Sequence, residues 1–236
     1  SCERQHPNSP ATGTMYVVDD GFALIFDMDG VIIDSTGTHT EAWRYYLRRH
    51  GIEVDQIADR MLGKHNADLV REFFAAGELS EEDVLRHGAQ KEELYRQMMA
   101  PIFEGKLVAG VREFIHQNAH RPIAVATNAE YPNIDFTLDR AGLRPFVRAI
   151  VNGDEVARPK PAPDIYLQAA RLLEKDPRDC IVFEDSTTGI AAARAAHMRV
   201  VGLTTTLPVL RGVDLEIRDF RDPALARWLL ESNMPV

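Results

Sequence analysis

The sequence contains little cysteine, no long apolar segment and no excess of positive charge. Its two cysteines are too few for a disulfide framework, so we expect a reducing, cytoplasmic location. No apolar run approaches the roughly 20 residues that a membrane-spanning helix requires, which predicts that the membrane is not a partner. The net charge of −9 argues against nucleic acid as a partner, because surfaces that bind phosphate backbones are basic.

What remains is the composition of an ordinary globular protein, with 45% hydrophobic and 27% charged residues. A chain of 236 residues can form one large domain or two modest ones. Residues 1–14 are polar and lack the apolar core of a signal peptide. We therefore predict a flexible N-terminal tail over residues 1–18.

Patterns typical of strands and of helices alternate through most of the chain. We expect strands at 22–26, 122–126, 149–151, 181–183, 199–203 and 217–220, and helices at 111–119, 133–141, 164–173, 188–196 and 223–231. Such alternation predicts an α/β fold, in which a parallel sheet is covered by helices on both faces. Ligands of these sheets bind beyond the carboxyl ends of the strands.

Residues 36–106 interrupt this alternation because they contain no convincing strand. They offer three helices, at 39–50, 66–76 and 80–99, and Ser80 with Asp83 resembles a capping box at the start of the third. We expect an inserted all-helical cap over 36–106 and a core made of 19–35 and 107–236. The cap could close over the site as a lid, or it could only stabilise the edge of the sheet.

Two carboxylates directly follow the first apolar strand, in the stretch Asp27-Met28-Asp29-Gly30-Val31. Side chains two residues apart in an extended segment point the same way, so Asp27 and Asp29 face one crevice. Carboxylates at the end of a buried strand need a compensating charge, which a hard cation such as Mg²⁺ supplies. One aspartate could then attack phosphorus while the other moves a proton. The alternative is a simple strand-end turn, in which Asp and Gly are common.

Two further segments place polar side chains at the same edge of the sheet. Thr127 and Asn128 follow the strand 122–126, where a hydroxyl and a backbone N–H could hold phosphate oxygens; the alternative is a turn or a helix cap. Lys160 lies among three prolines, which stiffen its loop. This setting favours a fixed positive charge beside a phosphate over a solvated surface lysine.

Glu184 and Asp185 place more acid at a second strand end. Solubility alone does not explain this arrangement, in which acidic groups from two strand ends, a lysine and a Thr-Asn turn converge on one crevice. Asp185 is the expected direct metal ligand, with Glu184 outside the direct ligands or linked to the metal through water. The alternative for Asp185 is a helix N-cap, and it could serve in both ways.

Together these stretches resemble, in order and spacing, the four motifs of haloacid dehalogenase-superfamily phosphatases. The four stretches are Asp27-Met28-Asp29-Gly30-Val31, Thr127-Asn128, Lys160 and Glu184-Asp185. The likeness is greatest to the branch of β-phosphoglucomutase-like and phosphoglycolate-phosphatase-like enzymes, which have a helical cap after the first motif. It covers about residues 21–220.

The resemblance implies a Rossmann-like core and a magnesium ion held by the Asp27 side chain, the Asp29 backbone carbonyl and Asp185. Asp27 would be the nucleophile that becomes an aspartyl phosphate. Asp29 would protonate the leaving group and then activate water. The phosphoryl group would be bound by Asp27, Gly30, Thr127, Asn128 and Lys160, of which Thr127 and Lys160 would clamp its oxygens during catalysis.

The residues expected to set the substrate depart from the phosphomutase pattern. The stretch His39-Thr40-Glu41-Ala42-Trp43 is similar to a mutase cap. Mutases of this kind, however, grip the far phosphate of the sugar with cationic cap residues and a lysine after the second motif. Glu130 stands where that cation would be needed, so we predict hydrolysis of a phosphomonoester. The candidate substrate contacts, each equally able to be a solvated cap residue, are His39, Lys64, His65 and Asn66.

The predicted function is therefore that of a Mg²⁺-dependent phosphatase acting on a small phosphorylated metabolite. The enzyme alternative is a sugar phosphomutase of the β-phosphoglucomutase type, and the non-enzyme alternative is a phosphometabolite-binding module. A binding module would not need every reactive group, whereas this chain has all five: Asp27, Asp29, Thr127, Lys160 and Asp185. We expect a monomer or a weak homodimer.

Overall fold

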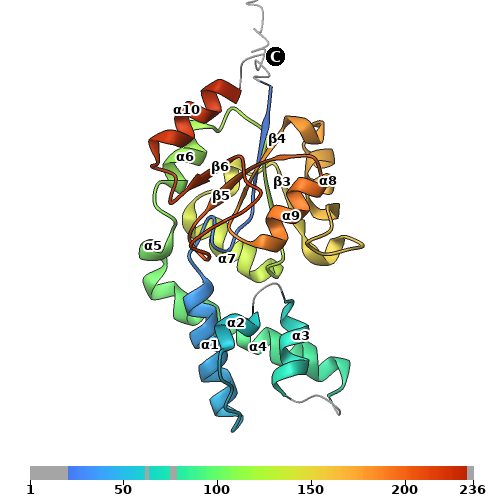
Figure 1. The fold of residues 1–236 in the computed structure, drawn as a ribbon. Coiled ribbons are helices and arrows are strands. Elements are labelled where there is room, and N and C mark those ends of the chain that lie inside the picture. Colours follow the sequence, from blue (N-terminus) through green and yellow to red (C-terminus); the bar gives the residue numbers. More distant parts are fainter. Residues whose placement is uncertain (1–20, 62–63, 75–78, 233–236) are drawn as a thin grey trace, which may run out of the picture.

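The computed structural model describes residues 21–61, 64–74 and 79–232. At its centre is a six-stranded sheet of parallel strands in the order β3-β2-β1-β4-β5-β6 (Figure 1). The strands are β1 (Ala23–Phe26), β2 (Ile123–Thr127), β3 (Ala149–Asn152), β4 (Cys180–Glu184), β5 (Arg199–Leu203) and β6 (Leu215–Ile217). The predicted parallel α/β fold is confirmed. The predicted tail, residues 1–18, lies outside the described residues.

The strand β1 occupies the middle of the sheet because its side chains are apolar on both faces. Leu24 and Phe26 belong to one core cluster, whereas Ala23 and Ile25 belong to the other. The strand pairs in register with β2 on one side and with β4 on the other. Phe26 stacks on Phe183 of β4, with ring centroids 4.7 Å apart. The carboxyl ends of these three strands therefore lie side by side at one edge of the sheet.

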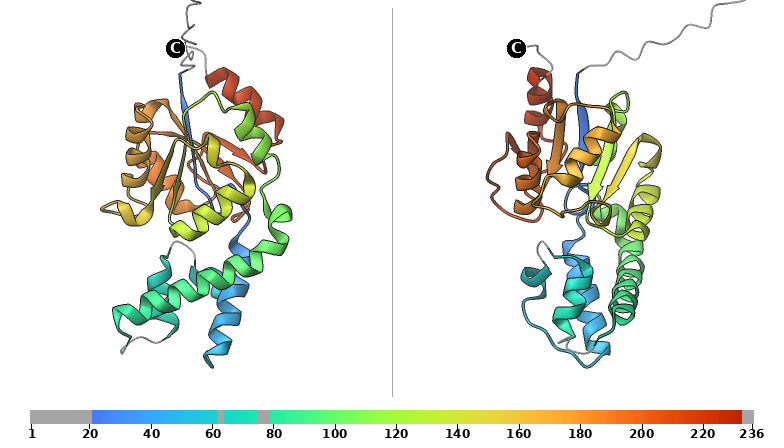
Figure 2. Two further views of the ribbon diagram at one scale, coloured as in Figure 1. Left: turned by 180° about the vertical axis from the view of Figure 1, so that it is seen from behind. Right: turned by 90° about the vertical axis from the view of Figure 1, so that its right-hand side faces the viewer.

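Helices cover both faces of the sheet (Figure 2). The helices α6 (Val111–Gln117), α7 (Tyr131–Ala141) and α10 (Pro223–Ser232) pack in the first core cluster. The helices α8 (Asp164–Leu172) and α9 (Thr187–Ala195) pack in the second. Three single 3₁₀ turns complete the connections around the sheet: η2 (Arg144–Phe146), η3 (Gly153–Glu155) and η4 (Pro177–Asp179).

The helices of residues 36–106 lie together beyond the carboxyl ends of the strands (Figure 1). They are α1 (Thr36–Arg49), α2 (Ile57–Met61), α3 (Asn66–Phe73) and α4 (Glu81–Met99), and η1 (Ala100–Ile102) and α5 (Phe103–Lys106) lead back to the sheet. An apolar cluster that includes Trp43 and Val70 holds them together. The helix α4 begins with the predicted capping box, in which Asp83 N–H donates to Ser80 Oγ at 3.1 Å and Ser80 N–H donates to Asp83 Oδ2 at 3.2 Å.

The structure differs from the predicted elements mainly at their ends. The helix α7 begins at Tyr131 rather than at 133, because Pro132 is tolerated in the first turn of a helix. The last strand, predicted at 217–220, is Leu215–Ile217. The sequence does not predict α2, because five residues are too few to display a helical period. Among the described residues, no helix is long and apolar enough to cross a membrane.

Candidate active site

A pocket of about 230 Å³ lies between the carboxyl end of the sheet and the helices of residues 36–106. Its volume is below the range of about 300–1,000 Å³ that is usual for drug-sized ligands, so it suits a small metabolite. The predicted site residues that line it are Asp27, Asp29, His39, Lys64, His65, Asn66, Thr127, Asn128, Lys160 and Asp185. The two others, Gly30 and Glu184, contact lining residues instead.

Lys160 joins the ends of two strands. Its Nζ donates to Asp27 Oδ1 at 2.7 Å, to Glu184 Oε1 at 2.8 Å and to the carbonyl oxygen of Ala126 at 3.3 Å. Burial alone would lower the pKa of Lys160, but the carboxylates of Asp27 and Glu184 raise it well above its ordinary value. The ammonium group is therefore a buried, fully charged and fixed group, because each of its three donors has a partner.

Glu184 is a support for Lys160 rather than a group that faces the pocket. Its side chain is fully buried, and Oε1 accepts hydrogen bonds from Lys160 Nζ and from the Tyr166 hydroxyl at 2.7 Å. Its Oε2 accepts from the backbone N–H groups of Asp185 and Ser186 and from the Ser186 hydroxyl. These contacts occupy both oxygens, which favours the interpretation that Glu184 is not a direct metal ligand.

Gly30 allows the Asp185 carboxylate to approach the turn after β1. Its φ of +77° lies in the left-handed region, and a Cβ at this position would stand 1.8 Å from Asp185 Oδ2. Any side chain here would therefore push Asp185 away from Asp27 and Asp29. The helix cap at the start of α9 is Ser186, whose Oγ accepts from the Gly189 N–H at 3.0 Å. The N-cap alternative for Asp185 is thus wrong.

The carboxylates at this edge carry a surplus of negative charge. Burial raises the pKa of Asp27 well above its ordinary value, whereas Lys160 lowers it. The neighbouring acids Glu184, Asp185 and Asp29 raise it further. Burial and Glu184 likewise raise the pKa of Asp185 to about 7. Such crowding of buried carboxylates favours a bound cation.

The donors of this cluster fit a magnesium ion. Within the described parts of the chain, no group of three or more His, Cys, Asp or Glu side chains is arranged to hold a metal by itself. The predicted ligand set needs only two such side chains, Asp27 and Asp185, together with the Asp29 carbonyl. Magnesium characteristically binds one or two carboxylates and completes its shell with water and substrate phosphate oxygens. The residues present therefore suit Mg²⁺ better than a metal that needs a complete protein cage.

Asp29 differs from Asp27 because it does not contact Lys160. Its Oδ1 accepts a hydrogen bond from the Ser35 hydroxyl at 2.6 Å, and His39 Nε2 lies 3.9 Å from the same oxygen. The ring of His39 stacks on Tyr95 of α4, with centroids 3.7 Å apart. Asp29 thus lies on the side of the pocket that α1 borders, and its carboxylate is held apart from Lys160.

Thr127 and Asn128 form the turn after β2. The buried Thr127 Oγ1 accepts from the Ala129 N–H at 3.1 Å, which leaves its own hydrogen able to donate to a phosphate oxygen. The exposed Asn128 packs against Gly153, where a Cβ would stand 2.4 Å from Asn128 Oδ1. Thr127 can therefore stabilise the turn through its oxygen and still donate its hydroxyl hydrogen to a phosphate.

The helix α4 contributes a buried charge pair that the sequence analysis does not single out. Lys91 is only 2% exposed, and its Nζ pairs with Glu92 and lies 3.2 Å from His39 Nδ1. Glu92 Oε2 also accepts from Asn133 Nδ2 at 2.8 Å, so the pair connects the cap to α7. The sequence contained a signal for this pair, because Lys91 and Glu92 fall on the helix face that also carries Val84 and Met99.

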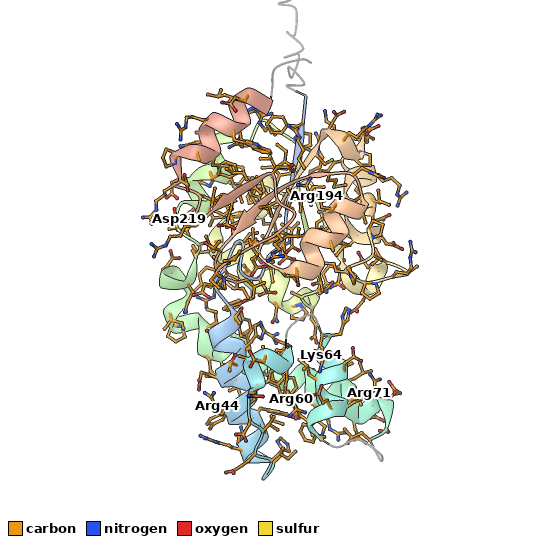
Figure 3. The ribbon with its side chains drawn as sticks, viewed as in Figure 1. Arg44, Arg60, Lys64, Arg71, Arg194 and Asp219 are labelled. Carbon is orange, nitrogen blue, oxygen red and sulfur yellow. The ribbon has the colours of Figure 1, made fainter. Side chains whose placement is uncertain are left out.

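The predicted cap contacts have unequal surroundings. Lys64 lies on the side of the cap nearest the sheet, whereas Arg44 and Arg71 lie farther from it (Figure 3). Lys64 Nζ pairs with Glu72 Oε2 at 2.5 Å, and it shares this carboxylate with Arg60. Asn66 Nδ2 donates to Glu130 Oε1 at 2.9 Å and thereby links the cap to the loop after β2.

Comparison with known proteins agrees with this geometry. A family model described as haloacid dehalogenase-like hydrolase matches residues 23–197. The fructose-1-phosphate phosphatase YqaB of Escherichia coli (strain K12) is 38% identical over 75% of this chain and 94% of that protein. The β-phosphoglucomutase of Bacillus subtilis (strain 168) is 30% identical over 86% of this chain and 92% of that protein.

Solved structures have the same fold. A β-phosphoglucomutase from Clostridium difficile superposes with a TM-score of 0.75 and 24% identity, over 89% of this chain and 96% of that chain. The parallel sheet, the motifs at its carboxyl edge and the match of the family model over most of the chain lead to one conclusion. This chain belongs to the haloacid dehalogenase-like hydrolase family.

Proposed function

We propose that this enzyme is a magnesium-dependent phosphatase that hydrolyses a small phosphorylated sugar or related metabolite through an aspartyl phosphate on Asp27. The observation that carries the proposal is the position of Asp27. It lies at the end of the central strand, its Oδ1 is held by Lys160 at 2.7 Å, and it lines the pocket. A carboxylate held in this way has one oriented face to present to phosphorus.

In the first step a carboxylate oxygen of Asp27 bonds to phosphorus as the bond between phosphorus and the ester oxygen breaks. The proton of Asp29 passes to that ester oxygen, so the product leaves as a neutral alcohol. In the second step water attacks phosphorus, its proton passes to Asp29, and Asp27 is released with inorganic phosphate. Lys160 and Thr127 stabilise the charge on the phosphoryl oxygens in both steps.

A bound magnesium ion would neutralise the phosphate oxygens and the crowded carboxylates, which otherwise repel the substrate. The residues proposed to hold it are Asp27, Asp185 and the backbone carbonyl of Asp29. Gly30 is proposed to act through Asp185, by leaving the room that its carboxylate needs. Glu184 is proposed to act through Lys160.

The relatives support a sugar phosphate as substrate, because one of them is named a fructose-1-phosphate phosphatase. Another is named a β-phosphoglucomutase, so the mutase stays the second candidate. Glu130 favours the phosphatase, because a bisphosphate intermediate would place a second phosphate beside a carboxylate. We further propose that residues 36–106 form a cap domain that closes over the pocket. The cytoplasmic location and the monomer or weak homodimer stay predictions.

Hydrolysis of p-nitrophenyl phosphate with Mg²⁺ and with excess EDTA tests the proposal. We expect turnover that is lost with EDTA, restored by Mg²⁺ and abolished in Asp27→Asn. The matched control is Asp55→Asn, which makes the same change at an exposed position and should retain full activity. Conversion of a hexose 1-phosphate to its 6-phosphate, dependent on a trace of bisphosphate, would favour the mutase. Turnover that is insensitive to both EDTA and Asp27→Asn would overturn the proposal.

A further inference from the structure

We infer that the part of the pocket nearest the cap selects substrates whose alcohol portion is neutral and rich in hydroxyl groups, and that Glu130 discriminates against a second anionic group. The inference rests on the proposed phosphatase function and deepens it to the class of substrate. It follows from the charges and hydrogen-bond acceptors that line the cap side of the pocket.

Glu130 places a negative charge where the loop after β2 meets the cap. Its Oε1 accepts a hydrogen bond from Asn66 Nδ2, and Asn66 is the first residue of α3. Because the donor is a neutral amide, this contact brings no positive charge to the carboxylate. Burial, together with the nearby Glu92, raises the pKa of Glu130, although Asn66, Lys91 and Arg96 oppose the shift. The carboxylate is half-buried, so solvent screens it less than it would an exposed carboxylate.

The lysines that line the pocket already have carboxylate partners. Lys64 Nζ lies 2.5 Å from Glu72 Oε2, and Glu72 also pairs with Arg60 at 2.6 Å. The buried Lys91 pairs with the adjacent Glu92. The remaining lysine of the lining is Lys160, which is bound to Asp27 and Glu184. A second phosphate or a carboxylate beside Glu130 would thus be repelled by that carboxylate. Lys91 and Lys160 are paired with carboxylates, and Lys64 shares Glu72 with Arg60.

The same boundary offers acceptors that need hydrogen donors. A carboxylate only accepts, so the Asn66 amide must turn its nitrogen toward Glu130 and its oxygen away. Among the described residues, Asn66 Oδ1 has no hydrogen-bond partner and is shielded from solvent. A hydroxyl group that enters between cap and core would supply the missing donor, whereas a phosphate or carboxylate oxygen would not.

The backbone of α4 is built to admit this amide. A Cβ at Gly88 would stand 2.9 Å from Asn66 Nδ2, although glycine is unfavourable inside a helix. Any larger residue at 88 would displace Asn66 from Glu130. The contact between Asn66 and Glu130 therefore depends on three elements, the loop after β2, α3 and α4, which all border the pocket.

The test compares pairs of esters that differ in one kind of group. Glycerol 3-phosphate and 3-phosphoglycerate differ by a carboxylate, fructose 1-phosphate and fructose 1,6-bisphosphate by a second phosphate, and glycerol 3-phosphate and propyl phosphate by hydroxyl groups. We expect wild-type kcat/KM to favour the neutral, hydroxyl-rich member of each pair by at least about tenfold, as expected for one poorly screened charge or two lost hydrogen bonds.

Variants at Glu130 then assign the selectivity. Glu130→Gln should lower the preference for neutral over anionic esters by about tenfold, and Glu130→Lys should lower it further or reverse it. The matched control is Glu93→Gln, the same change at an exposed position of α4, where the carboxylate accepts a hydrogen bond from Gln97. This variant should leave the preference unchanged. If Glu130→Lys does not fold, Glu130→Gln decides alone.

Binding of the same pairs to Asp27→Asn, followed by thermal shift, reports the selectivity without turnover. Equal binding and equal kcat/KM within each pair would overturn the inference, as would a preference of the wild type for the anionic members. An unchanged preference in Glu130→Gln would also overturn it. Failure of the wild type to hydrolyse any ester would overturn the proposed function instead, while the binding comparison would still decide the inference.

Discussion

Lys160 Nζ lies 2.7 Å from Asp27 Oδ1, although 133 residues separate the two in the chain. The parallel register of β1 and β4 makes this contact possible, because it places the ends of both strands beside the loop that carries Lys160. Glu184 holds the lysine from the other side at 2.8 Å. The lysine therefore orients the proposed nucleophile and also balances two buried carboxylates.

Replacement of Lys160 should impair both catalysis and stability. Lys160→Met removes the donor that would stabilise the phosphoryl oxygens, and we expect kcat to fall by about 10²–10³-fold. It also leaves Asp27 and Glu184 without their counter-ion, which should lower the free energy of unfolding by about 3–5 kcal/mol. Steady-state kinetics and urea unfolding measure the two effects. Arg148→Met, which removes a positive charge at an exposed position, is the control that should change neither. A Lys160→Met enzyme with normal kcat would contradict the account.

Tyr166 should matter through Glu184 rather than through the substrate. Tyr166→Phe removes the hydroxyl that donates to Glu184 Oε1 at 2.7 Å but keeps the ring beneath Lys160. We expect the free energy of unfolding to fall by about 1.5–3 kcal/mol, the range for a hydrogen bond to a charged group. We also expect kcat to fall while KM for the ester stays within about twofold, because the hydroxyl supports Lys160 and does not line the pocket. A variant whose KM alone rises would show that the hydroxyl contacts the substrate instead.

Cys180 should be unreactive in the folded protein. Burial raises the pKa of its thiol from the ordinary 9.0 to about 12, so very little thiolate exists near neutral pH. In a Cys2→Ser background, we expect a thiol reagent at pH 8 to modify Cys180 only after denaturation. Rapid labelling of the native protein would contradict this prediction.

The same shift predicts how stability depends on alkaline pH. Because the folded-state pKa of Cys180 is raised, its contribution is fully present below about pH 9 and is lost as the pH rises toward about 12. Cys180→Ala, compared with wild type by urea unfolding across this range, should show a smaller loss of stability with rising pH. An identical pH dependence in both proteins would show that the thiol does not contribute.

The parts of the site that could be predicted from the sequence are those encoded by neighbouring residues. Asp27, Asp29 and Asp185 follow apolar strands directly, so strand periodicity alone places them at the carboxyl edge of the sheet. The proline-flanked Lys160 could be predicted as a fixed charge for the same reason, since its own loop restricts it. The parallel sheet also followed from local alternation of strands and helices.

The contacts that could not be predicted join residues far apart in the chain. The Asn66–Glu130 hydrogen bond spans 64 residues and depends on how the cap meets the core. The contact of Lys160 with Glu184 likewise joins a loop to the end of β4 and depends on how the sheet is assembled. Tyr166 was overlooked because a tyrosine on a buried helix face is most often a packing residue, and only its contact with Glu184 assigns it to the site.

The most direct test of the central claim is to identify the residue that carries the phosphoryl group. In Asp29→Asn the attacking water lacks its base, so after acid quenching with substrate and Mg²⁺ we expect intact-mass and peptide analysis to find one added phosphoryl group on Asp27. The double variant Asp27→Asn/Asp29→Asn should carry none. Turnover by the wild type with no phosphoryl group trapped on Asp27, or with the group on another residue, would contradict the account.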